Sequence, residues 1–528
     1  MAPPLFTFRL RTRARLRIAA VAVAVLVLGL DASTPAPASS SNRITYFSAT
    51  SLDADIRPFW IAPGPDGNMW FTDTNSDRIG RITMNGHIRL FKAERGSKPY
   101  TIVAGPDGNM WFTEWQMNKL GVMDTHGNFI HKYPVANFEL SPYGIAVSPD
   151  GYLWFTGYNF EEPSAIDTVG RMSTDGQFVE LYQLNPCACE PLGVTAGPDG
   201  NMWITEELGA FDGYDYGSVD RVSLDGKTVD RFKMPDIQSL PAWISPGPDG
   251  KLWFGQYNAE HHQIGTIDTA GNITNYHVND AVSNTVAATA GPDRRIWFTE
   301  GDANDIWRMR PNGTLLESFS TGVHATPAGI TMGPDGNLWF AVAGSGEIGR
   351  LHTARPGTRY VLDIASGFVP SVRTAKLGDV VEWVLEAPGL HGVRDTTGLR
   401  LYDSGRQPPV SYLRYKFQAS GTYAYLDGGI GDRGRIAVPM EAPHHGHVGS
   451  PFTVRWASGT AVDLHHIFQV QIRRPGSASW KYLRFATTDH TATLTPIRAG
   501  TYRFRARLHD SDGAMSSGWS PVSRVDVR

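Results

Sequence analysis

The sequence of 528 residues is long enough for about three or four domains of roughly 150 residues each. Hydrophobic residues make up 41% and charged residues 19%, which excludes wholesale disorder, while 56 glycines and 35 prolines favour short strands and turns over a helical bundle. The formal net charge of −4 lacks the basic excess of nucleic-acid-binding proteins, so we expect no nucleic-acid partner.

The N-terminal residues 1–38 have the three-part layout of a secretion signal. Five arginines precede an apolar run from Ile18 to Leu30, and Ala36-Pro37-Ala38 offers small residues for cleavage. An uncleaved anchor is the alternative, although a run of 13 residues is short for a membrane span. We therefore expect a secreted or cell-envelope protein whose mature chain has no membrane span.

One phrase recurs seven times between residues 43 and 355, first as Gly64-Pro-Asp-Gly-Asn-Met-Trp-Phe-Thr72. Its tryptophans follow one another at intervals of 41 to 50 residues, the length of a four-stranded propeller blade. The sequence thus predicts an all-β fold, with a seven-bladed β-propeller over residues 43–355 and two β-sandwich domains after it. We expect the seven tryptophans to pack between blades rather than to bind a ligand: Trp70, Trp111, Trp154, Trp203, Trp253, Trp297 and Trp339.

The last blade is one strand short, because the seventh repeat stops after Leu351 without a fourth strand. Residues Arg43 to Phe47 alternate like an outer strand and precede the first repeat. We expect this segment to complete blade seven and close the ring.

The repeats resemble the virginiamycin B lyase (streptogramin lyase) family over residues 43–352. The resemblance rests on the phrase Gly-Pro-Asp-Gly-Asn-Met-Trp-Phe-Thr and on the Ile-Gly-Arg-Ile that follows it. It implies a seven-bladed propeller and a carbon–oxygen lyase that opens a lactone or cyclic depsipeptide by elimination. It also implies a histidine base and a Mg²⁺ ion held by carboxylates.

Blade geometry places the starts of the inner strands and the ends of the second strands on one face, which we call the mouth. The strand starts bring aromatic residues there: Phe59, Trp60, Tyr100, Tyr143 and Trp243. The strand ends bring acidic and amide residues: Asp73, Glu114, Glu206, Glu207, Gln256 and Glu300. Aromatic surfaces suit a ring-bearing small molecule or a glycan, so Trp60, Tyr100, Tyr143 and Trp243 are the candidate ligand-binding residues.

The resemblance implies that Glu206 and Glu300, which end Trp-Ile-Thr-Glu and Trp-Phe-Thr-Glu, are the candidate Mg²⁺ ligands. Each carboxylate could instead cap the loop of its own blade. Family strand starts often read Pro-His, whereas no strand start in this sequence does. His324, shortly before Pro327, is the candidate catalytic base, and the pair His261-His262 is a further candidate.

Cys187 and Cys189 are the two cysteines of the chain and lie in a loop on the mouth side. In an exported protein we expect them to form a disulfide that stiffens the loop, although so short a step is strained. Free thiols and a soft-metal site are the alternatives.

Two further β domains follow the repeats. Residues 358–439 resemble a plastocyanin-like cupredoxin, on Gly378-Asp379-Val-Val-Glu-Trp383 and Gly421-Thr-Tyr-Ala-Tyr425. The family's copper positions fall on His391, Leu426, Gly429 and Asp432, so we expect no copper. After a linker from Pro439 to Pro451, residues 451–528 resemble a fibronectin type III module.

Three functions remain open at this point, and with them the question of whether the protein is an enzyme. The first is a Mg²⁺-dependent carbon–oxygen lyase acting on a lactone or cyclic peptide. The second is a non-catalytic propeller that binds a glycan or peptide or serves in adhesion, and the third is a metal-dependent lactone hydrolase. We expect a monomer in each case.

Overall fold

A computed structural model describes the chain from residue 43 onward, apart from several short segments. The described ranges are 43–135, 140–158, 167–185, 190–207, 210–211, 214–215, 217–236, 239–257, 262–278, 283–458, 466–512 and 514–528. Within these ranges the chain forms strands and no helix, so no described segment is an apolar helix long enough to cross a membrane. The predicted all-β class is confirmed, while the candidate signal residues 1–38 and both Cys187 and Cys189 lie outside the described residues.

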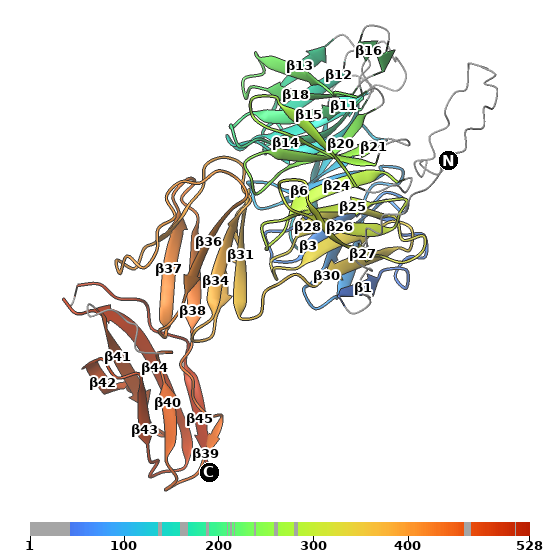
Figure 1. Cartoon of the computed structure of the whole chain (residues 1–528). Coiled ribbons are helices and arrows are strands. Elements are labelled where there is room, and N and C mark those ends of the chain that lie inside the picture. Colours follow the sequence, from blue (N-terminus) through green and yellow to red (C-terminus); the bar gives the residue numbers. More distant parts are fainter. Residues whose placement is uncertain are drawn as a thin grey trace, which may run out of the picture.

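Seven four-stranded antiparallel sheets, numbered here as blades one to seven, make up the described part of residues 43–355 (Figure 1). The innermost strand of each blade contacts that of the next, and the seventh contacts the first, so the blades form a closed ring. Blade one consists of β2 (Pro58–Pro63), β3 (Met69–Asp73), β4 (Arg78–Ile82) and β5 (Ile88–Lys92). Blade two consists of β6 (Pro99–Ala104), β7 (Met110–Glu114), β8 (Lys119–Met123) and β9 (Phe129–Pro134). Blade three consists of β10 (Ser141–Val147), β11 (Leu153–Tyr158), β12 (Asp167–Met172) and β13 (Phe178–Asn185).

The remaining blades follow the same plan. Blade four is β14 (Pro191–Ala196), β15 (Met202–Glu206), β18 (Ser218–Val222) and β19 (Val229–Lys233), with the short pair β16 (Ala210–Phe211) and β17 (Tyr214–Asp215) between its second and third strands. Blade five consists of β20 (Leu240–Pro246), β21 (Leu252–Tyr257), β22 (Gln263–Ile267) and β23 (Ile273–His277). Blade six consists of β24 (Thr285–Ala290), β25 (Ile296–Glu300), β26 (Asp305–Met309) and β27 (Leu315–Ser320). Blade seven consists of β28 (Pro327–Met332), β29 (Leu338–Val342), β30 (Glu347–Leu351) and β1 (Ile44–Ser48).

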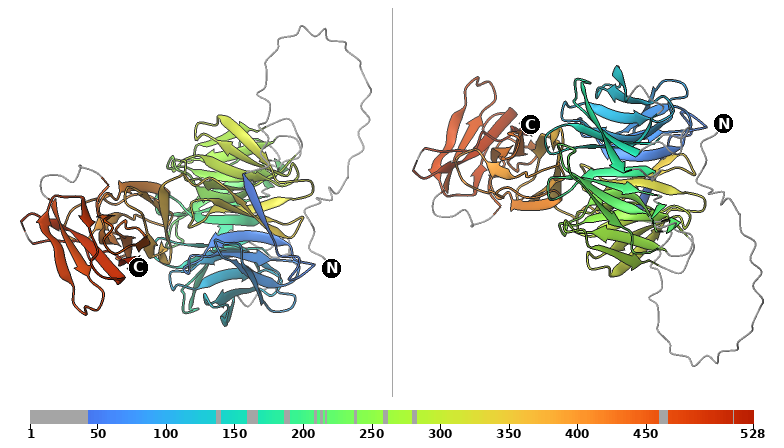
Figure 2. Two further views of the ribbon diagram at one scale, coloured as in Figure 1. Left: turned by 90° about the horizontal axis from the view of Figure 1, so that it is seen from below. Right: turned by 90° about the horizontal axis from the view of Figure 1, so that it is seen from above.

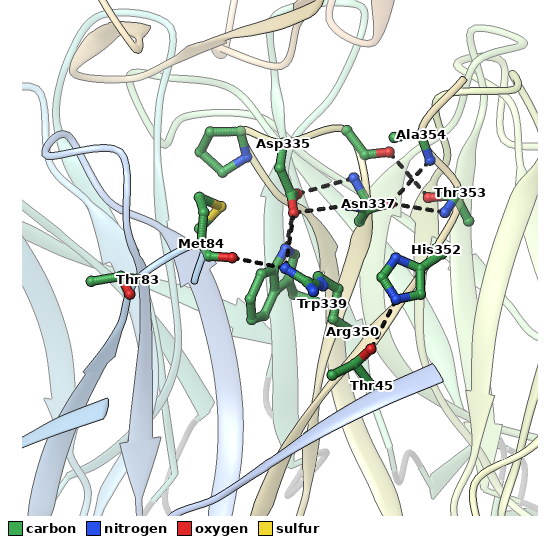
Figure 3. A network of polar contacts seen from close by, with 12 residues as sticks. Thr45, Thr83, Met84, Asp335, Asn337, Trp339, Arg350, His352, Thr353 and Ala354 are labelled. Carbon is green, nitrogen blue, oxygen red and sulfur yellow. Dashed lines mark hydrogen bonds and ion pairs between the residues drawn. The ribbon is translucent and has the colours of Figure 1, made fainter. Parts of the chain in front are cut away.

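The N-terminal strand β1 completes blade seven, as the sequence predicts. It pairs antiparallel with β30, from Ile44 opposite Leu351 to Ser48 opposite Glu347. Arg350 then ties this blade to the first, because its guanidinium lies 5.2 Å above the Trp339 ring and donates a 2.7 Å hydrogen bond to the Met84 carbonyl (Figure 3). The ring is therefore closed by a strand pairing and by a side chain that reaches across the seam.

The seven tryptophans of the repeat are packing residues. All are at most 2% exposed. Trp339 shows the pattern: its indole N–H donates to Asp335 of the Pro-Asp-Gly turn at 3.0 Å (Figure 3). Its ring stacks on Phe47, with ring centroids 5.5 Å apart. Six of the seven tryptophans donate to the aspartate of their own turn in this way and so anchor it to the core of the blade, whereas the Trp154 indole has no hydrogen-bond partner.

Residues 358–438 form a second unit of two four-stranded sheets. One sheet has the order β32 (Gly367–Val369), β31 (Thr358–Ile364), β34 (Val380–Leu385) and β36 (Ser411–Lys416). The other has the order β33 (Val372–Thr374), β38 (Arg433–Val438), β37 (Gly421–Asp427) and β35 (Val393–Asp395). Buried side chains from both sheets, among them Trp383, Tyr425 and Ile436, belong to one core.

The third unit begins earlier than its sequence suggests. Its larger sheet has the order β39 (His445–Gly446), β45 (Ser523–Val527), β44 (Gly500–Asp510), β41 (His466–Arg473) and β42 (Lys481–Thr487), beside the pair β40 (Phe452–Arg455) and β43 (Thr491–Leu494). Strand β39 lies in the segment expected to be a linker. A His-Gly pair has no strand signature, and β39 forms through backbone pairing with β45 alone.

The second unit packs on the propeller face that carries the Pro-Asp-Gly turns (Figures 1 and 2). The Tyr412 hydroxyl donates to the Gly291 carbonyl of blade six at 2.9 Å, and the Arg373 guanidinium donates to the Pro334 carbonyl of blade seven. Gly389 lies against Pro149 of blade three. The third unit in turn contacts the second, where the Thr422 hydroxyl donates to the Trp519 carbonyl at 2.8 Å. The mouth therefore lies on the face of the propeller opposite these units.

Candidate functional site

A β-bulge near the start of each inner strand shapes the mouth. In all seven blades, two consecutive residues of the inner strand lie opposite a single residue of the second strand, just after the inner strand begins. Bulges re-aim side chains, and the bulge positions hold the aromatic residues that the sequence assigned to the mouth. The bulged pairs are Phe59-Trp60, Tyr100-Thr101, Tyr143-Gly144, Leu192-Gly193, Ala242-Trp243, Val286-Ala287 and Ala328-Gly329.

The threonine of the Trp-Phe-Thr phrase holds these bulges in place. The Thr205 hydroxyl accepts a 2.9 Å hydrogen bond from the Gly193 N–H of its own blade and donates a 2.6 Å hydrogen bond to the Ala242 carbonyl of the next. Four equivalent threonines make the same two bonds: Thr72, Thr113, Thr156 and Thr299. One hydroxyl thus links two neighbouring bulges, which fixes the mouth residues relative to one another.

Five aromatic side chains from four inner strands meet at the mouth, and we call them the aromatic cluster: Phe59, Trp60, Tyr100, Tyr143 and Trp243. Phe59 stacks on Tyr100 with ring centroids 4.3 Å apart, and Tyr100 meets the edge of Tyr143 at 5.0 Å. Trp60 and Trp243 lie 4.6 Å apart. Tyr100 and Trp243 are buried, whereas the other three remain partly exposed. The structure therefore brings all four predicted ligand-binding residues together.

One buried carboxyl group, that of Glu207, adjoins the aromatic cluster. Glu207 directly follows β15 at the mouth, where burial raises the pKa of Tyr100 and of Tyr143 and a charge on Glu207 contributes to both shifts. The side chain is 5% exposed, and its Oε1 atom has no hydrogen-bond partner. Burial, and secondarily the charge of Glu190, raise the pKa of Glu207 to about 8, so this group holds its proton at neutral pH. A protonated carboxyl group can donate a hydrogen bond to a ligand carbonyl.

Glu206, a predicted Mg²⁺ ligand, belongs to an ion-pair network inside blade four. Its carboxylate lies 2.6 Å from the Arg231 guanidinium and accepts a 2.8 Å hydrogen bond from the Ser218 hydroxyl. Arg231 also contacts Asp220 at 2.9 Å. Adjacent residues of a strand point to opposite sides, so Glu206 and Glu207 have different surroundings. The Arg231 guanidinium thus neutralises the Glu206 carboxylate within the blade, and a role of Glu206 as a Mg²⁺ ligand stays a prediction.

Glu300, the other predicted Mg²⁺ ligand, caps the loop of its own blade. Its Oε1 accepts a 2.7 Å hydrogen bond from the Thr285 hydroxyl, its Oε2 has no hydrogen-bond partner, and burial raises its pKa. Glu206 and Glu300 belong to blades four and six, with blade five between them. These contacts do not make a common Mg²⁺ site, and we derive no step through one.

The structure describes two of the three candidate histidines, His324 and His262. His324 is exposed in the loop before β28, where its φ of 61° is left-handed and its carbonyl packs against Gly344. His262 is buried, and its ring accepts a hydrogen bond from the Ser283 N–H, while His261 lies outside the described residues. The role of His324 as a base stays a prediction.

Substituting Glu207 is expected to change how stability depends on pH. Between its ordinary pKa of 4.5 and about 8, the folded protein holds a proton that the unfolded chain releases. Stability therefore falls as the pH rises through this window. The variant Glu207→Gln cannot ionise and should flatten that slope, as measured by thermal unfolding at intervals from acid to mildly basic pH. Equal slopes for the two proteins would contradict the buried, proton-holding state of Glu207.

The comparisons with known proteins concern the propeller. The model of the virginiamycin B lyase family matches residues 39–207 and 128–379. A solved streptogramin B lyase is 30% identical, with a TM-score of 0.52, over 58% of this chain and 97% of that one. A catalytically inactive histidine-to-alanine variant of virginiamycin B lyase from Staphylococcus aureus with quinupristin is 30% identical, with a TM-score of 0.52, over 58% and 98%. No curated protein matches the chain.

Proposed function

The chain belongs to the virginiamycin B lyase family, and we propose that its propeller binds a cyclic, ring-bearing peptide or lactone at the mouth. The aromatic cluster is the observation that carries this proposal. Phe59, Trp60 and Tyr143 keep part of their surfaces exposed, and each rests on a buried partner ring. Such a preformed apolar surface suits the rings of a ligand and requires little ordering on binding.

Glu207 supplies the polar part of the proposed interaction. A protonated carboxyl group donates one hydrogen bond, and the carbonyl oxygens of esters and amides accept one. A cyclic depsipeptide offers both kinds of carbonyl beside hydrophobic rings. A glycan, by contrast, would need several hydroxyl partners around its ring, and the aromatic cluster supplies mainly apolar surface. The N-terminal signal-like segment fits a protein that meets such a ligand outside the cytoplasm.

Family membership favours a second candidate function, the opening of the bound ring by a carbon–oxygen lyase. In that reaction a base removes a proton from the carbon next to a carbonyl, the carbon–oxygen bond breaks, and the product keeps the mass of the substrate. Glu207, the buried carboxyl group that follows β15 at the mouth, supports this second candidate function. In its ionised form, above about pH 8, this carboxylate could act as that base.

The test uses quinupristin, the compound named with the staphylococcal structure. Calorimetry of the full-length protein should show binding, and chromatography with mass spectrometry should show the compound intact after incubation with Mg²⁺ or with EDTA. A linear product of unchanged mass would establish the lyase instead, and the gain of one water would establish a hydrolase. Absence of measurable binding at high micromolar concentration would overturn the proposed function for this ligand class.

A further inference from the structure

The second unit contains a buried group of metal-ligating side chains that the propeller does not involve. Asp363 at the end of β31, His391 after β34 and Asp427 at the end of β37 lie together at one edge of the unit. One ligand atom from each lies within 4.8 Å of the other two, and the three residues are at most 4% exposed. Among the described residues this is the group with metal-binding geometry.

The imidazole of His391 is oriented as a metal ligand requires. Its Nε2 lies 2.9 Å from the Pro388 carbonyl, an atom that only accepts hydrogen bonds, so Nε2 carries a proton. Its Nδ1 faces both carboxylates, with Asp427 Oδ2 at 2.7 Å and Asp363 Oδ2 at 3.3 Å. Metal-bound histidines commonly donate their second N–H to a backbone carbonyl in this way.

Asp427 is held in place by the backbone around it. Its Oδ1 accepts hydrogen bonds from the N–H groups of Gly392 at 2.9 Å and Gly429 at 2.7 Å. Its Oδ2, which receives a longer 3.3 Å bond from Ile430, is the atom that faces His391. The backbone therefore orients the carboxylate through Oδ1, and Oδ2 is the oxygen that points toward His391.

Asp363 gives an independent indication that a cation belongs here. The residue is fully buried, and neither of its carboxylate oxygens has a hydrogen-bond partner. His391 Nδ1 makes its hydrogen bond with Asp427, so Asp363 has an ion-pair contact with His391 at 3.3 Å but no hydrogen bond, and a buried carboxylate without hydrogen bonds is costly. A divalent cation at the meeting point of the three atoms would pair both carboxylates at once and leave the site neutral.

We infer that Asp363, His391 and Asp427 bind a divalent transition-metal ion of the zinc class that stabilises the second unit. One nitrogen and two oxygen ligands suit Zn²⁺, with bonds of about 2.0–2.2 Å, better than Ca²⁺, which prefers six or more oxygens. Asp432, whose Oδ2 would lie 2.5 Å from a Cβ atom added to Gly367, is the neighbouring carboxylate that could add a further ligand. The ion would enter during folding, because the group is buried.

The test measures Zn²⁺ on the full-length protein. After treatment with EDTA and its removal, titration with zinc chloride should show one equivalent bound and a rise in unfolding temperature. The isosteric variant Asp363→Asn should weaken Zn²⁺ binding by about 100-fold or more. Asp403→Asn, which alters an exposed carboxylate of the same unit, should bind Zn²⁺ as the original protein does.

Three results would overturn the inference. In the first, the original protein binds no Zn²⁺. In the second, the Asp363→Asn variant binds Zn²⁺ with unchanged affinity. In the third, the protein loses its one bound equivalent of Zn²⁺ when His444, His445 and His447 are all changed to alanine. In each case the three residues form only a buried ion pair. Circular dichroism checks folding, and if Asp363→Asn does not fold, His391→Gln takes its place with the same expected loss.

Discussion

Replacing Gly255 by threonine, which would give blade five the Trp-Phe-Thr phrase of blade six, is expected to destabilise the protein by about 3 kcal/mol or more. A Cβ atom at this position would lie 2.2 Å from the Thr285 carbonyl oxygen and 2.6 Å from that of Val286. Both oxygens belong to the backbone of β24, so the inner strand of blade six would have to move. Restoring the common residue of the repeat would therefore weaken the ring.

Denaturant unfolding measures this effect through the shift of the midpoint at constant slope. Gly301→Ala is the matched control, because it also adds an atom at the mouth beside Val286. The nearest neighbour of that added Cβ is a side-chain methyl group at 3.2 Å, which can give way. If Gly255→Thr proved as stable as Gly301→Ala, the result would contradict the close approach of β21 to the backbone of β24.

Removing the ring of Tyr143 is expected to weaken quinupristin binding by about tenfold or more, since partly exposed aromatic anchors dominate the energy of such surfaces. Tyr143 meets the edge of Tyr100 and stacks on Trp115 at 6.0 Å, so its loss opens the aromatic cluster on one side. Its backbone carbonyl, which accepts the Thr113 hydroxyl at 2.9 Å, is unchanged in Tyr143→Ala. Calorimetry of Tyr143→Ala gives the affinity directly.

Tyr143→Phe serves as the control for this experiment. It keeps the ring and loses the hydroxyl, so it should bind quinupristin almost as the original protein does. A large loss in Tyr143→Phe would assign the effect to the hydroxyl group. Unchanged binding in Tyr143→Ala would remove this residue from the ligand surface.

Most of the fold could be predicted from the repeat, because each part of its phrase has a local structural role. The Pro-Asp-Gly turn needs a glycine with positive φ, as at Gly67 with φ 75°, and the tryptophan marks a buried strand. The missing strand of blade seven could be found by counting, since Leu351 ends the last repeat one strand early. The start of the third unit could not, because β39 depends on pairing with a strand about 80 residues later.

The candidate site was only partly predictable. Inner-strand starts gather at one face in any propeller, so Trp60 and Trp243 could be assigned to the mouth before their contact was known. The glutamates were harder, since Glu206 and Glu207 are neighbours in sequence and the family pattern favoured Glu206. Alternation along β15 would have separated them, because Thr205 faces the next inner strand and Glu207 lies on the same side of the chain. The Asp363 group combines the ends of two strands with one loop, all distant in sequence, and leaves no motif.

The position of the second unit bears on how a small molecule can reach the mouth of the propeller. Its contacts fall on turns of blade three and of the adjacent blades six and seven, which lie on opposite sides of the ring. The second unit therefore bridges the turn face of the propeller from one side of the ring to the other. We expect a ligand bound at the mouth to enter and leave on the mouth side, because the other face carries this unit.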